Sequence, residues 1–170
     1  GRIVDFWSPP KPTHLLIAHD GQNIFDPRTA TRRSTWRMAQ NGIKVFEEAG
    51  LTPPAIIGVF HSSSKSDPNG RFKDLTPQKP FLTNVKPQVE TTLKIDELHG
   101  DDYQRLIADE IVPSILDYLN FKPSFENIAM VGSSMGGLAT LNALALRKDF
   151  FDTALAFSPH WVIGGKALVE

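Results

Sequence analysis

Five short runs of apolar residues are the feature that most constrains the fold of this chain. They cover residues 3–7, 14–18, 55–60, 128–131 and 154–157. Most of these runs are apolar throughout instead of alternating, which is typical of strands in a sheet covered by helices on both faces. Strands that alternate with helices form a mainly parallel sheet with right-handed crossovers. The pattern therefore predicts an α/β fold with three layers.

Three stretches between these runs have the periodicity of amphipathic helices. The first is predicted to begin near residues 34–35 and to end at Gly50. The second covers residues 103–115 and should bend at Pro113, because proline lacks a backbone donor. The third covers residues 138–145. Each lies between two predicted strands, as a crossover helix does.

Composition excludes several classes of protein. The chain of 170 residues fits one domain or part of a larger one. A net charge of -1 removes the usual electrostatic argument for nucleic acid or an anionic membrane as a partner. Without cysteine, disulfide scaffolds, Cys-ligated zinc and thiol catalysis are excluded. No apolar run approaches the ~20 residues of a membrane span. We expect no nucleic-acid and no membrane partner, while the compartment stays open between cytoplasm and exterior.

A long segment interrupts the regular alternation. Residues 61–99 are rich in Pro, Ser, Lys and Asp and follow the carboxyl end of a predicted central strand, where open α/β sheets bind ligands. Loops of more than about 15 residues are usually functional or disordered. The segment carries enough apolar residues to fold down as a cap: Phe72, Leu75, Phe81, Leu82, Val85 and Leu93. Two interpretations remain open, a lid that shapes a substrate pocket and a floppy surface insert.

Residues 132–137, GSSMGG, carry the strongest chemical signal. They lie directly between a predicted strand and a predicted helix, and they contain the pattern G-x-S-x-G with Ser134 at its centre. This is the pattern of a nucleophile elbow, a sharp turn that exposes a serine hydroxyl above the sheet. The phosphate-binding alternatives fail, because Leu138 stands where a Walker loop needs lysine, and the glycine spacing does not match a dinucleotide fingerprint.

A serine that attacks a carbonyl also needs donors for the oxyanion that forms. One donor is expected to be the backbone N–H of Met135, the residue after the nucleophile. The other is expected from Gly21 or Gln22, in the loop HDGQNIFD that follows the run 14–18. For the loop's polar side chains a simpler interpretation stays open, in which they only cap a turn. His14 and His19 do not form an H-E-x-x-H pair, so a zinc hydrolase has no support and we expect no metal.

These motifs together resemble the putative esterase family of α/β-hydrolases, which includes enterochelin esterase-like, feruloyl and acetyl-xylan esterases, S-formylglutathione hydrolases and mycolyltransferases. The resemblance covers nearly the whole chain. Besides residues 132–137 and 19–26, it is carried by Thr35-Trp36, Arg71, residues 74–77 (DLTP) and residues 101–113. It implies hydrolysis of a small-molecule carboxylic ester through an acyl-enzyme, without a cofactor. Relative to the family, the sheet is expected to be truncated, lacking the first and last strands.

The motifs do not identify the base and the acid that should activate Ser134. In α/β-hydrolases they follow the serine in the order Asp or Glu, then His. Asp152 and His160 have that order, but the strand between them separates them by about 20 Å at ~3.3 Å per residue. The triad partners are therefore expected beyond Glu170 in a longer parent chain. A short protein that has lost its catalytic apparatus is the alternative.

The resulting prediction is a partial α/β-hydrolase domain over residues 1–170 with a cap-like loop at 61–99. His160 and Trp161 follow the end of a strand and are expected to contact substrate, although a locally bonded loop histidine and a sealing tryptophan are the simpler interpretation. The alternative function is a non-catalytic α/β-hydrolase-like module that binds a ligand or a protein. Acyl transfer to an alcohol instead of water is a variant within the enzyme class.

Overall fold

The computed structural model describes residues 1–83, 86 and 94–168. A five-stranded sheet with the order β1-β3-β2-β4-β5 forms its centre. The strands are β1 Val4–Trp7, β2 Leu15–His19, β3 Ala55–Val59, β4 Ile128–Ser133 and β5 Thr153–Phe157. All neighbouring pairs are parallel except β1 with β3. The mainly parallel α/β sheet predicted from the apolar runs is confirmed.

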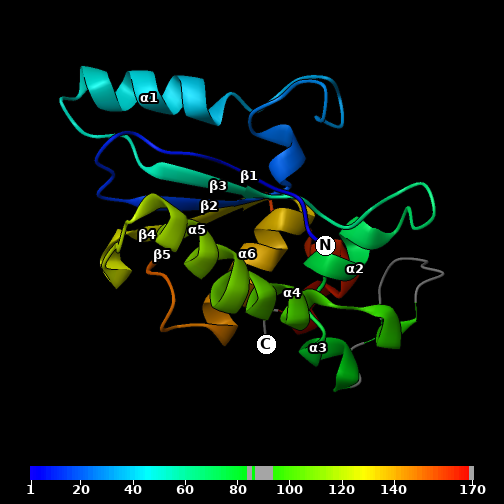
Figure 1. Cartoon of the computed structure of the whole chain (residues 1–170). Helices are drawn as coiled ribbons and strands as arrows, with labels where there is room; N and C mark the ends of the chain where they lie inside the picture. The colour runs from blue at the N-terminus through cyan, green and yellow to red at the C-terminus, as the bar shows by residue number, and fades with distance from the viewer. Residues whose placement is uncertain (84–85, 87–93, 169–170) are drawn as a thin grey trace.

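Helices cover both faces of the sheet, so the three layers are also confirmed (Figure 1). Helix α1 lies on one face, while α4, α5 and α6 lie on the other. The helices are α1 Met38–Glu48, α2 Gly70–Leu75, α3 Lys79–Leu82, α4 Gly100–Leu106, α5 Val112–Leu119 and α6 Met135–Leu146. In the part of the chain that the structure describes, no helix is long and apolar enough to cross a membrane.

Alternate residues of the central strands fill two separate cores. Ile17 and Ile57 pair across β2 and β3 and are fully buried in the larger core, beneath α4 to α6. Their neighbours Ala18 and Ile56 point to the opposite face and belong to the smaller core, where α1 contributes Ala39. The period-2 alternation of side chains thus gives each helix layer its own apolar surface.

Two expectations need correction. Helix α1 begins at Met38, not near residues 34–35, and its N-cap position is occupied by Arg37 in the left-handed region with φ 54°. The Thr35 hydroxyl accepts a hydrogen bond from the Arg37 N–H at 3.3 Å, so it supports a turn before the helix. Strand β5 is not covered on both faces, because Leu155 is 40% and Phe157 59% exposed at the edge of the sheet.

Near Pro113, where the sequence predicted a bend, the helix changes type. Helix α4 continues into a π-helical stretch, Ile107–Ile111, and α5 then begins at Val112 with the proline in its first turn. Because Pro113 has no N–H to donate to the preceding turn, the ordinary α-helical hydrogen-bond pattern cannot continue through this position, and a π-helical stretch precedes it.

The described parts of the long segment after β3, residues 61–83, 86 and 94–99, include several short helical elements. These are α2, α3 and the 3-10 turn η2, Ile95–Glu97. Leu75 and Phe81 are buried in the larger core, whereas Leu82 is exposed. Val85 and Leu93, which also supported the cap prediction, lie outside the described residues. The described parts of this segment therefore help to build the core.

Candidate active site

Ser134 occupies the sharp turn between β4 and α6. Its backbone has φ 58° and ψ −118°, a conformation that costs a non-glycine residue of order 1–3 kcal/mol and persists only where neighbours hold it. Here the Ser134 N–H donates to the Phe157 carbonyl at 2.9 Å. The Ser134 carbonyl accepts from the N–H groups of Leu138 and His160, each at 3.1 Å. Three backbone hydrogen bonds thus hold the turn predicted from the motif.

The glycines of the motif allow the strand and the helix to approach. A Cβ at Gly132 would overlap the backbone of Gly136, and a Cβ at Gly137 would lie 2.9 Å from the Phe157 carbonyl oxygen. Larger residues at these two positions would therefore push α6 away from the sheet. The spacing of glycines around Ser134 follows from this steric requirement.

Ser134 is half-buried, and among the described residues nothing is hydrogen-bonded to its hydroxyl. Met135, the next residue, is buried and begins α6. Because the first N–H groups of a helix have no partner within it, the amino end of α6 offers donors beside the serine. The hydroxyl and these donors lie at the carboxyl edge of the sheet.

The turn η1, Gly21–Asn23, follows β2 at the same edge, since β2 and β4 run parallel and pair side by side. Gly21 lies against β3, where a Cβ would overlap the Gly58 backbone. The elbow also touches this turn region. A Cβ at Gly136 would be 3.3 Å from both the Asp20 carboxylate and the His19 side chain. The structure therefore brings the two predicted halves of the site together.

Gln22 is buried together with its side-chain amide. Only 6% of the residue is exposed, and neither amide atom has a partner among the described residues. Its backbone carbonyl accepts a hydrogen bond from the Thr29 hydroxyl at 2.9 Å. The Thr29 hydroxyl thus holds the backbone of η1, while the Gln22 amide is buried without a partner among the described residues, a feature that the sequence motif did not predict.

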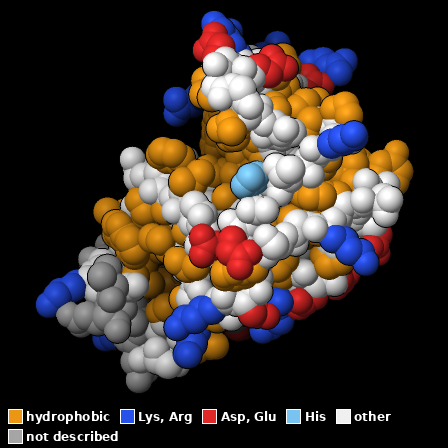
Figure 2. Space-filling model, turned by 90° about the vertical axis from the view of Figure 1, so that its left-hand side faces the viewer, with side chains coloured by type: hydrophobic (Ala, Val, Ile, Leu, Met, Phe, Trp, Pro, Cys, Tyr) orange, Lys and Arg blue, Asp and Glu red, His pale blue; other side chains and the backbone are white. Residues whose placement is uncertain are grey.

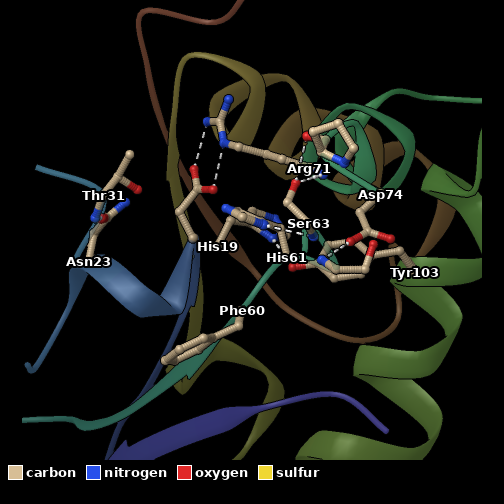
Figure 3. A network of polar contacts seen from close by, with 12 residues as sticks. His19, Asn23, Thr31, Phe60, His61, Ser63, Arg71, Asp74 and Tyr103 are labelled. Atoms are coloured by element: carbon tan, nitrogen blue, oxygen red, sulfur yellow. Dashed lines mark hydrogen bonds and ion pairs between the residues drawn. The ribbon is translucent and has the colours of Figure 1, made fainter. Parts of the chain in front are cut away.

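Arg71 on α2 binds the carboxylate of Asp20 in a bidentate ion pair (Figure 3). Its Nε and Nη2 each donate to one Asp20 oxygen at 2.7 Å. Asp20 is only 1% exposed and has φ 56°, so the arginine neutralises a buried carboxylate in a left-handed turn position. The family resemblance included Arg71, but no pattern in the sequence indicated that it pairs with Asp20, 51 positions away.

His19 is fully buried behind the elbow. Its Nδ1 lies 3.1 Å from the Tyr103 hydroxyl, and its Nε2 has no partner among the described residues. Burial lowers the pKa of His19 from 6.5 to about 4; the charge of Asp20 opposes this effect and that of Arg71 adds to it. The imidazole is therefore neutral at pH 7. Burial also raises the pKa of the Tyr103 hydroxyl, which stays protonated.

A second buried ion pair supports the same region. Arg2 donates to the two Asp74 oxygens at 2.6 and 3.1 Å, and the Ser62 N–H donates to Asp74 at 2.6 Å. The Arg2 guanidinium also lies 5.2 Å from the centre of the Tyr103 ring. Figure 3 shows His19, Arg71, Asp74 and Tyr103 gathered around this region. Sequence reasoning missed this network, because its members are separated along the chain.

The residues on either side of β5 lie at opposite ends of β4. The Asp152 N–H donates to the carbonyl of Ile128 where β4 begins, whereas the His160 N–H donates to the carbonyl of Ser134 just after β4 ends. This arrangement agrees with the expected separation of Asp152 and His160. Trp161 is half-buried and lines a hollow of about 400 Å³ with residues of α6 and 77–83; neither Ser134 nor η1 lines it.

No imidazole in residues 1–83, 86 and 94–168 is hydrogen-bonded to a carboxylate. His19 contacts Tyr103, and His61 accepts a hydrogen bond from the Ser63 N–H at 3.1 Å. His14 is paired with the Thr13 hydroxyl at 2.9 Å. A relay from serine through histidine to an acid is therefore not assembled within this part of the molecule.

The parallel sheet, the helices on both faces and the strained serine turn after a central strand define an α/β-hydrolase fold. A family model described as Putative esterase matches residues 4–165. The chain therefore belongs to this family, as the motifs indicated.

Two curated proteins have related sequences. The ferri-bacillibactin esterase BesA of Bacillus subtilis is 26% identical over 160 residues, which are 91% of this chain and 51% of BesA. A siderophore enterobactin esterase of Emericella nidulans is 30% identical over 153 residues, 88% of this chain and 46% of that protein. The chain thus spans about half the length of these relatives.

Solved structures share the fold. The BES protein from Bacillus cereus has a TM-score of 0.66 at 19% identity, with 98% of this chain and 58% of that chain covered. The enterobactin and salmochelin hydrolase IroE also has a TM-score of 0.66, at 22% identity, with 98% of this chain and 59% of the IroE chain covered. At these identities the likeness establishes the architecture alone.

Proposed function

We propose that this protein hydrolyses carboxylic esters, with Ser134 as the nucleophile. The observation that supports this most is the strained, half-buried Ser134 at the carboxyl edge of the sheet, with the Asp20–Gln22 region packed against its turn. In the proposed reaction the Ser134 oxygen attacks the ester carbonyl while a base takes its proton. The alcohol then leaves, and water releases the acyl group from the serine.

Two backbone N–H groups would stabilise the oxyanion. One belongs to Met135 at the amino end of α6, and the other to Gly21 or Gln22 in η1. Each such donor is worth about 10²–10³ in turnover, because it is already oriented toward the charge that develops. The tight packing of Gly21 on Gly58 and the clamp of Arg71 on Asp20 support this role, since both hold η1 in one position.

The general base would be a histidine with an acidic partner. His19 is a poor candidate, because it is fully buried and has a pKa of about 4. His160 is half-buried and its backbone N–H donates to the Ser134 carbonyl, which supports it as a proposed substrate contact. Trp161 has less support for this role, because neither Ser134 nor η1 lines the hollow that it borders. Because no histidine among the described residues is hydrogen-bonded to a carboxylate, we expect the 170-residue chain alone to turn over activated esters poorly or not at all.

Siderophore esters are the proposed substrate class to test first, because the two curated relatives are a ferri-bacillibactin esterase and a siderophore enterobactin esterase. Both names describe cleavage of an ester bond, which is the bond that a serine nucleophile attacks. No metal or organic cofactor is needed for the proposed chemistry, which uses side chains, backbone N–H groups and water.

A fluorophosphonate probe tests the nucleophile directly. We expect labelling of the protein expressed from its complete gene, located by mass spectrometry at Ser134 and lost in Ser134→Ala. Ser133→Ala is the matched control, since Ser133 is the adjacent half-buried serine, and it should keep the label. If the wild-type serine stays inert, the hydrolase proposal fails and the non-catalytic binding module is favoured. That module is consistent with the lack of a histidine–carboxylate pair among the described residues.

A further inference from the structure

Helix α1 leaves an apolar hollow between itself and the sheet. The hollow has a volume of about 320 Å³, within the range of small-molecule pockets. Its walls include Trp7, Leu16, Trp36, Ile43, Phe46 and Ile56. Figure 2 shows hydrophobic side chains gathered beneath α1, which forms the top of the molecule in that view. Neither Ser134 nor η1 lines this hollow, so it is separate from the candidate active site.

The packing of α1 leaves this space unfilled. Within the helix only Ala39 is buried, although α1 has 11 residues. Gly42 lies in the middle of the helix and lines the hollow, and an added Cβ there would meet no atom within 4 Å. A glycine inside a helix costs about 1 kcal/mol relative to alanine, so this wall of the hollow stays open at some cost in helix stability. The unfilled volume therefore suits an occupant other than the protein's own side chains.

Two exposed polar side chains line the hollow near the start of α1. Arg37 and Asn41 both line the hollow and are exposed. They are four positions apart in the sequence, Asn41 being in the first turn of α1 and Arg37 at its N-cap position, and both line the same hollow. Among the described residues neither side chain has a hydrogen-bond or ion-pair partner, and no acidic residue lines the hollow. A guanidinium and an amide N–H₂ beside each other form a binding pair for a carboxylate.

We propose that this hollow binds a small aromatic carboxylate. The aromatic rings of Trp7, Trp36 and Phe46 favour a flat ring system, which can stack on or meet the edges of their side chains. The carboxylate lies at the mouth, on Arg37 and Asn41. This arrangement has an apolar body and a few convergent polar groups, as ligand sites generally do. The site does not depend on the proposed hydrolase activity.

Calorimetric titration with 2-naphthoate tests the proposal in the protein expressed from its complete gene. Arg37→Gln should weaken binding at least tenfold, because it removes the charge that pairs with the carboxylate. Arg33→Gln is the matched control, since Arg33 is an exposed arginine that does not line the hollow, and its affinity should equal that of the wild type. The neutral isostere 2-naphthylmethanol should also bind at least tenfold more weakly.

Filling the hollow provides a second test that preserves the fold. Gly42→Leu adds a side chain in open space and should abolish binding, while Gly42→Ala should keep it within about threefold. Far-ultraviolet circular dichroism checks that both variants are folded. No binding of 2-naphthoate to the wild type would overturn the proposal. Binding that is unchanged in both Arg37→Gln and Gly42→Leu would also overturn it, because the ligand would then lie elsewhere.

Discussion

Lowering the pH from 7 to 5 should destabilise this protein through His19. The pKa of this buried histidine is about 4 in the folded protein, compared with 6.5 when it is exposed. The unfolded chain therefore binds a proton more readily than the folded chain between these two values. The stability conferred by the neutral imidazole is present in full above pH 6.5 and is lost as the pH falls toward 4.

The size of the effect follows from the same two pKa values. Each unit of pKa difference is worth about 1.4 kcal/mol, so His19 contributes about 3 kcal/mol in total. About 2 kcal/mol of this should be lost between pH 7 and pH 5. His61, whose pKa is also lowered by burial, changes stability in the same direction. A comparison of variants is needed to isolate the contribution of His19.

Urea unfolding at pH 7 and pH 5 provides the assay. In His19→Asn, which does not titrate, the loss of unfolding free energy between the two pH values should be about 2 kcal/mol smaller than in the wild type. In His99→Asn, which removes an exposed histidine, the loss should match the wild type. If wild type and His19→Asn lose the same amount, the buried imidazole is not the source and the reasoning is refuted.

Three further predictions concern packing and charge. Arg71→Met should reduce the free energy of unfolding by about 3 kcal/mol, since it leaves the buried Asp20 carboxylate unpaired; Asp20→Asn in the same protein should recover part of the loss, measured by urea unfolding. Gly21→Ala should slow fluorophosphonate labelling at least tenfold, because its Cβ would displace η1 from Gly58; an unchanged rate would show that η1 supplies no donor. Gly42→Ala should raise the free energy of unfolding by about 1 kcal/mol, and a decrease would contradict the open space beside it.

Local sequence was sufficient to predict most of the fold, because strands, helices and the elbow depend on residues close together in the chain. The start of α1 was placed wrongly, since Trp36 does not join the helix: its N–H donates to the Asn23 carbonyl at 2.8 Å. The run at residues 154–157 was expected to end the sheet, but its apolar composition did not indicate that Leu155 and Phe157 are exposed.

The sequence by itself determined the kind of chain this is: an α/β protein with a serine between a strand and a helix, framed by the glycines that such a turn requires. Only the tertiary structure decided how the site is supported. The pairing of Asp20 with Arg71 and of Arg2 with Asp74 spans 51 and 72 positions. Such contacts arise when strand order brings distant loops to one sheet edge, and no local pattern encodes which buried charge will meet which.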